Sequence, residues 1–218
     1  MIDAGKLKAL IVDLDGTLYF QFPVRLCMLC SIVFFCLTHP FKIKHIKLVR
    51  SYRRMYAKGI DHSERCLALS KEFDLDINQT EDIIQKWMIH KPLRSVRRFR
   101  DKNLIKLLAD KKNRGYKIIV YSDYPVTEKL KALDFTPCAA YAAEDVGCLK
   151  PSPEGLLHIL SENELEAADC LFIGDKYDKD GKCAENAGME YIILPQSKPG
   201  RKRVLLTQWG RFSLCSLV

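Results

Sequence analysis

The 218-residue sequence predicts an α/β protein, in which helices cover a parallel sheet and a helical domain is inserted after the first strand. Three observations predict this fold. Short apolar runs alternate with amphipathic segments after residue 97, an order typical of parallel strands joined by right-handed crossovers. Polar side chains follow three of these runs, and residues 20–96 contain only helix-like segments. We therefore predict a core over residues 1–19 and 97–218, and a second domain over residues 20–96.

The first strand is predicted over residues 10–12, an apolar run typical of a strand buried on both faces. Two carboxylates, Asp13 and Asp15, follow it at once, and Gly16 and Thr17 come next. A strand that enters a core does not end in two charges unless something there uses them. We expect these residues at the carboxyl end of the strand, where sheets of this class bind ligands.

Residues 20–96 are predicted to be helical. An apolar run between Pro23 and Pro40 leads into residues 42–58, which hold seven basic residues and no acid. Two further amphipathic helices are expected over residues 62–73 and 80–90, the second capped by Thr80.

The apolar run at residues 24–37 has two interpretations. We take it as too short, and too close to Arg25, to span a membrane. It then packs inside the helical domain or against a second copy of the chain. Alternatively, the run and the cationic helix after it lie together on an anionic membrane surface, where a lipid-linked phosphate would be the substrate.

The remaining elements alternate between helix and strand. The second apolar strand ends at Ser122, and a helix after Lys150 begins with Ser152 as its N-cap and Pro153 at its first position. The tail from Ser197 is basic and then apolar. Helices are predicted over residues 101–114 and 181–189, and two more are predicted to begin near residues 125 and 152. The predicted strands cover residues 116–122, 138–144, 170–175 and 191–195.

Polar groups from three strand ends should meet at one rim of this sheet. Besides Asp13 and Asp15, they are Ser122 with Asp123, and Asp175. The carboxyl ends of parallel strands share one edge, so these groups, with Lys150, indicate a site.

The acidic residues of this rim favour a metal ion. Asp13 and Asp15 are two residues apart and point to the same side of the strand. Asp175 and Asp180 add charge to the same place, and such crowding is costly unless a cation neutralises it. Oxygen ligands without histidine or cysteine suit Mg²⁺.

The same residues suit phosphoryl transfer. An ionised Asp13 can attack phosphorus and form an aspartyl-phosphate. Asp15 can donate a proton to the leaving oxygen and later accept one from water. Ser122 and Lys150 can offset the charge of the transferred group.

Four motifs resemble those of the haloacid dehalogenase-like (HAD) hydrolase superfamily. They are "DLDGTL", "IIVYSD", "KPSP" and "GDKYDKDGKCAENAGM", in the family's order, over about two-thirds of the chain. The insertion after the first motif resembles the helical cap of the phosphoglycolate phosphatase-like branch. The resemblance implies that Asp13 is the nucleophile and Asp15 the acid/base. It also implies that Ser122 and Lys150 bind the phosphate, and that Asp175 and Asp180 are the acidic positions of the metal site.

The resemblance also implies a Rossmann-like core, a mobile cap, and Mg²⁺ held by Asp13, the Asp15 backbone carbonyl and Asp175. We expect Gly16, Thr17 and Asp123 to help bind the substrate. True dehalogenases of the superfamily lack the second aspartate, so Asp15 favours a phosphatase acting on a small phosphorylated metabolite. A phosphomutase or a non-catalytic anion-binding protein stays open, and so does the question whether Asp178 joins Asp180 in the metal site.

Composition narrows the setting of this chemistry. Nine cysteines without a regular framework favour a reducing cytoplasm, and the first strand begins too near Met1 to leave room for a signal peptide. Residues 20–114 carry 21 basic and 9 acidic residues. This charge attracts anions, but no nucleic-acid-binding motif accompanies it, so we expect no nucleic-acid partner.

Overall fold

The computed structural model describes residues 7–209 and confirms the predicted α/β class. Contacts divide the chain into two compact units, Met1–Phe22 with Phe99–Val218, and Pro23–Arg98. These units are defined by contacts alone, so the predicted domain boundaries at residues 20 and 96 stay a prediction. We describe each unit by itself.

The first unit is built on a five-stranded parallel sheet with the order β3-β2-β1-β4-β5. β1 is the central strand, and it pairs in parallel with both β2 and β4. Ile11 of β1 lies opposite Ile119 on one side and Phe172 on the other. The strands are β1 Ala9–Val12, β2 Lys117–Ser122, β3 Ala139–Ala142, β4 Cys170–Gly174 and β5 Glu190–Ile193.

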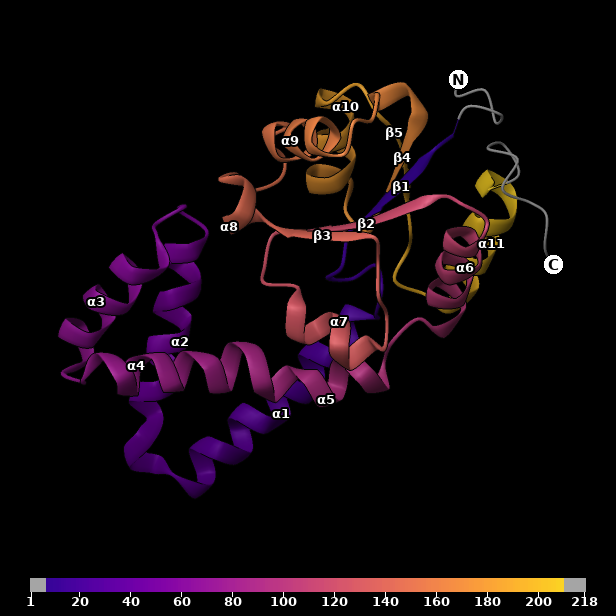
Figure 1. Ribbon diagram of the computed structural model, residues 1–218. Helices are drawn as coiled ribbons and strands as arrows, with labels where there is room; N and C mark the ends of the chain where they lie inside the picture. The colour runs from indigo at the N-terminus through magenta and orange to yellow at the C-terminus, as the bar shows by residue number, and fades with distance from the viewer. Residues whose placement is uncertain (1–6, 210–218) are drawn as a thin grey trace. The chain divides into compact units, whose positions relative to one another are not determined.

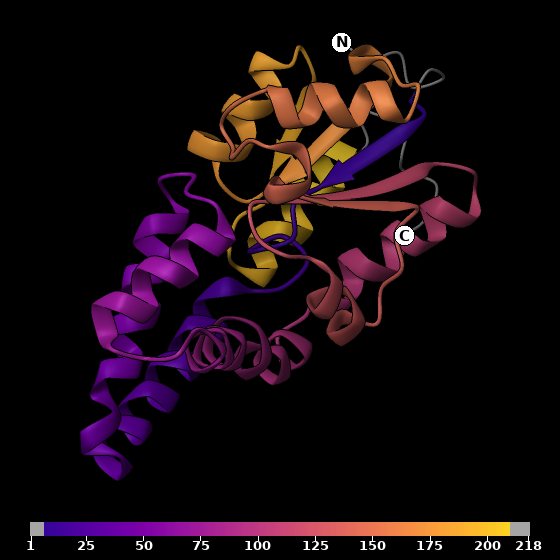
Figure 2. The same ribbon diagram turned by 60° about the vertical axis from the view of Figure 1, so that its left-hand side comes forward.

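Helices cover both faces of this sheet, as Figures 1 and 2 show for α9 and α10 on one face and α6 and α11 on the other. Strand residues alternate between the faces, so Ala9 and Ile11 pack with Leu156 and Ile159 of α9 in one buried cluster. The helices of this unit are α6 Lys102–Asn113, α7 Thr127–Leu133, α8 Ala143–Val146, α9 Glu154–Glu162, α10 Lys182–Asn186 and α11 Lys198–Trp209.

The second unit is helical. Tyr52 and Tyr56 of α2 hold the buried guanidinium of Arg65 on α3, with its Cζ 4.7 and 4.6 Å from their ring centroids. A π-helical stretch, Gln85–His90, joins α4 to α5. The helices are α1 Gln21–Thr38, α2 Ile43–Tyr56, α3 His62–Phe73, α4 Ile77–Ile84 and α5 Lys91–Arg98.

Two predicted helix starts are wrong. Thr80 is not an N-cap, because α4 begins at Ile77 and the Thr80 hydroxyl donates to the Asp76 carbonyl within the helix. α9 begins at Glu154, two residues after Ser152. In both cases the true start lies within three residues of the predicted one, where more than one residue suits a cap.

The interpretation of the apolar run as a segment packed inside the helical domain holds for only one side of the helix. Of α1, Val24 alone is buried among the residues that the structure describes, and a whole face of the helix is exposed. By length and composition alone, the 18-residue helix is also long and apolar enough to cross a membrane. The expectation that the run is too short therefore does not hold.

Candidate active site

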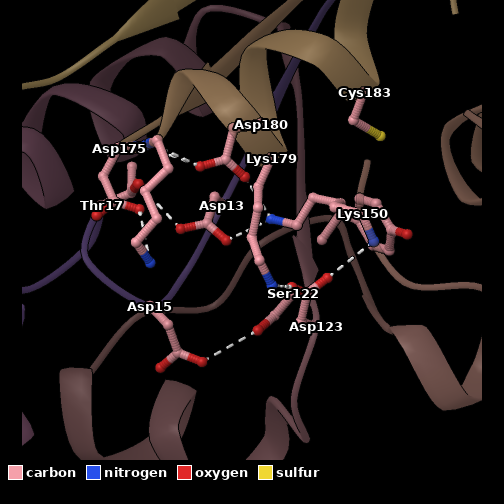
Figure 3. A network of polar contacts seen from close by, with 12 residues as sticks. Asp13, Asp15, Thr17, Ser122, Asp123, Lys150, Asp175, Lys179, Asp180 and Cys183 are labelled. Carbon is pink, nitrogen blue, oxygen red and sulfur yellow. Dashed lines mark hydrogen bonds and ion pairs between the residues drawn. The ribbon is translucent and has the colours of Figure 1, made fainter. Parts of the chain in front are cut away.

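Asp13 lies at the carboxyl end of β1, and its side chain is almost fully buried. Its backbone N–H donates to the Ile173 carbonyl of β4, 2.8 Å away, which continues the sheet by one residue. Lys150 Nζ donates to Oδ1 at 2.6 Å, and Thr17 Oγ1 donates to Oδ2 at 3.0 Å. The carboxylate is thus fixed in orientation by two donors from separate loops (Figure 3).

Asp175 and Asp180 lie beside Asp13, and one carboxylate oxygen from each of the three lies within 4.8 Å of the others. Asp180 Oδ2 accepts the backbone N–H groups of Asp175 and Lys176, each at 3.0 Å. Its Oδ1 accepts Lys150 Nζ at 2.6 Å. Asp178, the alternative left open by the sequence, is exposed and lies outside this cluster.

The electrostatics of the cluster favour a cation. Burial, reinforced by the nearby charge of Asp180, raises the pKa of Asp13 to about 7. Burial likewise raises the pKa of Asp175 to about 6. Burial opposes the charge of Lys150 as well, but Asp13 and Asp180 outweigh it and raise the pKa of its ammonium. Three carboxylates face the buried ammonium of Lys150 and the more exposed ammonium of Lys176, which lies 3.9 Å from Asp175 Oδ1, so the cluster keeps a negative charge that a cation with oxygen ligands would balance.

The Asp15 side chain points away from this cluster (Figure 3). Lys129 Nζ contacts both of its carboxylate oxygens at 2.6 Å, Tyr19 donates its hydroxyl to Oδ1, and Ser122 Oγ donates to Oδ2 at 3.3 Å. Burial opposes ionisation of Asp15, but Lys129 outweighs it, so its pKa lies below its usual value. The side chain is therefore ionised, apart from the predicted metal ligands, and close to Ser122.

Asp123, expected to bind substrate, has partners within the protein. Its Oδ1 accepts the Lys150 backbone N–H at 3.1 Å, and its Oδ2 accepts Lys179 Nζ at 2.8 Å. These contacts hold the loop that carries Lys150 against the end of β2. The geometry therefore gives Asp123 a positioning role, and its contact with substrate stays a prediction.

Gly16 and Thr17 form the turn after Asp15. Gly16 has a φ of +110°, and a Cβ added there would collide with the Asp175 carboxylate. Arg201 of α11 donates to the carbonyls of both Gly16 and Thr17, and Gln196 Nε2 donates to the Gly16 carbonyl at 2.8 Å. The turn is thus held by residues far away in the sequence.

Sequence reasoning missed five residues that shape this site: Tyr19, Lys129, Lys179, Gln196 and Arg201. Tyr19 follows Asp15 by four residues, which was a usable signal. Lys179 lies within the fourth motif, in the π-helical turn Tyr177–Gly181, but no pattern marked it as part of the site. Lys129, Gln196 and Arg201 come from α7, a loop and α11, outside the four motifs, and they reach the site through long side chains.

A second group of possible metal donors lies in the helical unit. His62 and Cys66 of α3 and Glu81 of α4 each offer an atom within 4.8 Å of the others. His62 Nδ1 also lies 2.9 Å from the Tyr52 hydroxyl. This group was not foreseen, because Glu81 comes from a different helix.

Comparison with known proteins places this geometry in a class. A family model described as haloacid dehalogenase-like hydrolase matches residues 7–188. No curated protein matches the sequence. The fold and its aspartate-lined strand ends define a hydrolase built on a Rossmann-like sheet. The chain belongs to the haloacid dehalogenase-like hydrolases, a family of enzymes.

Solved structures with low sequence identity share the fold. A 2-haloacid dehalogenase from Pseudomonas syringae pv. Tomato has a TM-score of 0.62 at 20% identity, with 86% of each chain covered. A family hydrolase from Deinococcus radiodurans with bound phosphate and sodium has a TM-score of 0.60 at 16% identity, covering 99% of this chain and 100% of that one. A putative family hydrolase from Bacillus subtilis bound to magnesium has a TM-score of 0.57 at 17% identity, with 87% of each chain covered.

Proposed function

We propose that this hydrolase is a Mg²⁺-dependent phosphatase that cleaves the phosphate monoester of a small metabolite through an aspartyl-phosphate on Asp13. The observation that carries the proposal is the pair formed by Asp13 and Asp15. Asp13 lies in an acidic cluster, and Asp15, two residues on, has its own ammonium partner and contacts Ser122. A dehalogenase has no leaving alcohol to protonate, so it has no use for this second carboxylate.

The metal would be held by Asp13, Asp175 and the Asp15 backbone carbonyl, with Asp180 beside them. The donor set fits, because it consists of oxygens and stays negatively charged beside Lys150 and Lys176. When bound, Mg²⁺ keeps the carboxylates ionised and offsets the charge of the phosphate oxygens.

In the first step a carboxylate oxygen of Asp13 bonds to phosphorus, and the bond from phosphorus to the leaving oxygen breaks. Thr17 and Lys150 orient the Asp13 carboxylate for this attack. The Lys150 ammonium would offset the charge of the transferred group, and the Ser122 hydroxyl would donate a hydrogen bond to it.

Proton transfer falls to Asp15 and Lys129 as a unit. The Lys129 ammonium donates to both carboxylate oxygens of Asp15 at 2.6 Å, so the pair holds one transferable proton. The pair can lend this proton to the leaving oxygen in the first step. It takes a proton back in the second step, when water attacks the aspartyl-phosphate and releases inorganic phosphate.

Phosphate release from a panel of phosphorylated metabolites and an aryl phosphate tests the proposal. We expect turnover with Mg²⁺, loss of turnover with chelator, and loss in Asp13→Asn. Asp178→Asn is the matched control, because Asp178 is exposed and outside the cluster. The control should keep its activity. No release by folded, Mg²⁺-binding protein would favour the phosphomutase or the non-catalytic anion-binding alternative.

A second candidate substrate is a lipid-linked phosphate. The exposed apolar face of α1 favours it, because a soluble enzyme for a small metabolite has no need of such a face. The same assay with the phosphate presented in mixed micelles distinguishes the two. Turnover restricted to the micellar substrate would make the lipid-linked phosphate, and not the small metabolite, the proposed substrate.

A further inference from the structure

One face of α1 is apolar and exposed along its whole length. Its residues recur at the spacing of a helix face and continue into the turn that follows. Phe34, Leu37 and Phe41 are 68%, 77% and 96% exposed. Large apolar side chains that gather on one exposed face mark an interaction site. The other large members of the face are Leu26, Leu29 and Val33.

The opposite face of α1 belongs to the helical unit. Phe35 contacts the ring of Trp87 edge-on, with 5.0 Å between centroids, and stacks on His39 at 4.9 Å. Trp87 is itself buried. The helix is thus docked along one side, and its exposed face is the side left over.

The topology of the sheet rules out a single membrane crossing by α1. β1 precedes α1, whereas β2 and β4 follow it, and β1 lies between them in one sheet. A single crossing would put β1 on the opposite side of the membrane from both of its partners. Residues 7–209 contain no second helix long and apolar enough to return the chain. If α1 enters a membrane, it must therefore lie in the interface and not span it.

The charge of the segment that carries this face is of one sign. Residues 16–60 contain no aspartate or glutamate, and eight lysines and arginines lie between residues 21 and 60. Lys42, Lys44, Lys47 and Arg50 are exposed immediately after Phe41. Two copies of the chain meeting through this face would bring like charges together. Anionic headgroups would instead neutralise them.

We propose that α1 and the start of α2 form a membrane-docking surface, with the apolar face of α1 inserted into the interface of a bilayer that contains anionic lipid. This inference goes beyond the proposed phosphatase activity. Membrane binding can be measured without turnover, so the docking proposal and the phosphatase proposal can fail separately.

Flotation of the full chain with vesicles tests the docking. We expect binding to vesicles of phosphatidylglycerol and phosphatidylcholine, and much weaker binding to phosphatidylcholine alone. Phe34→Ser/Leu37→Ser/Phe41→Ser should lower the partition coefficient about tenfold or more, because it removes three apolar anchors. The control is Leu67→Ser/Leu157→Ser/Leu206→Ser, which changes three exposed residues elsewhere and should bind like the unmodified chain.

The charge contribution has its own matched pair. Lys42→Glu/Lys44→Glu/Lys47→Glu should lower binding by at least about a hundredfold, since the loss of each basic residue near an anionic surface costs about fivefold and each glutamate adds repulsion. Lys102→Glu/Lys106→Glu/Lys182→Glu changes the net charge equally at exposed sites elsewhere and should have a much smaller effect.

Three outcomes would overturn the proposal. They are no binding to anionic vesicles at low salt, equal loss in test and control variants, and a dimer in light scattering that the Phe34, Leu37 and Phe41 variant alone dissociates. The last outcome would assign the face to a second copy. Thermal melting of each variant confirms that it is folded, and turnover of a soluble aryl phosphate should be the same in all of them.

Discussion

Arg201 is the residue whose replacement tests the architecture of the site most directly. Its side chain is 2% exposed, and its guanidinium donates to the Asp101 carboxylate at 2.9 Å and to the carbonyls of Gly16, Thr17 and Pro195. Arg201→Met keeps much of the apolar stem but removes every donor. It leaves a buried carboxylate without its partner, so we expect a large loss of stability.

The expected magnitude follows from the buried ion pair. Removing one partner of such a pair costs about 3–5 kcal/mol. For a chain of this length each kcal/mol corresponds to about 2–4 °C in melting temperature, so a drop of roughly 6–20 °C is expected. Differential scanning calorimetry measures it. Arg203→Met is the control, because Arg203 is exposed on the same helix.

A double-mutant cycle isolates the pair. Asp101→Asn removes the charge but keeps an oxygen that can cap α6, where Asp101 Oδ1 now accepts the Leu104 N–H at 3.1 Å. Adding Asp101→Asn to Arg201→Met should cost less than the sum of the single changes. A drop below about 3 °C for Arg201→Met, or strict additivity, would refute the reasoning.

Three further predictions concern ionisation at the site. Burial raises the pKa of Asp13 to about 7 and that of Asp175 to about 6, so Mg²⁺ must displace protons. Its affinity should rise from about pH 5 to 8, and calorimetry in two buffers should detect proton release; equal heats would contradict this. Because both pKa values exceed that of an unfolded aspartate, the metal-free native state binds more protons than the unfolded state and loses stability as pH rises from about 4 to 7. Melting temperatures in chelator should fall across that window, and less so in Asp13→Asn; a flat profile would argue against buried, crowded carboxylates. Lys129→Met removes the ammonium that holds the pKa of Asp15 low, and it leaves Asp15 alone to donate the proton of the first step, so the basic limb of kcat/KM should move down by about 1 pH unit or more, and Lys129→Arg should reverse this. An unmoved limb would separate Lys129 from the acid/base step.

The rim of the site was predictable because its residues end strands. Asp13, Ser122 and Asp175 each follow an apolar run, and parallel strands bring such ends together whatever the intervening chain contains. The alternation of strands and helices likewise fixed the fold class. These features depend on local sequence pattern, which a single sequence displays.

The partners of those residues were not predictable. Lys129 lies 114 residues from Asp15, and Arg201 lies 185 residues from Gly16. Neither carries a local signal, because a lysine or arginine on a helix usually faces solvent. The sequence left open whether the apolar run of α1 is packed or exposed, for a related reason. Hydropathy shows that a helix is apolar, whereas tertiary packing decides which of its sides is covered.

The central position of β1 has a consequence for synthesis of the chain. Ile11 pairs with residues 108 and 161 positions further on, and the contiguous helical unit, Pro23–Arg98, is translated in between. On a ribosome the helical unit is therefore complete while the first strand still has two open edges. Such an edge can pair with other nascent chains. The central strand is made first and closed last, so elongation speed and chaperone access between residues 13 and 170 govern the yield of folded enzyme.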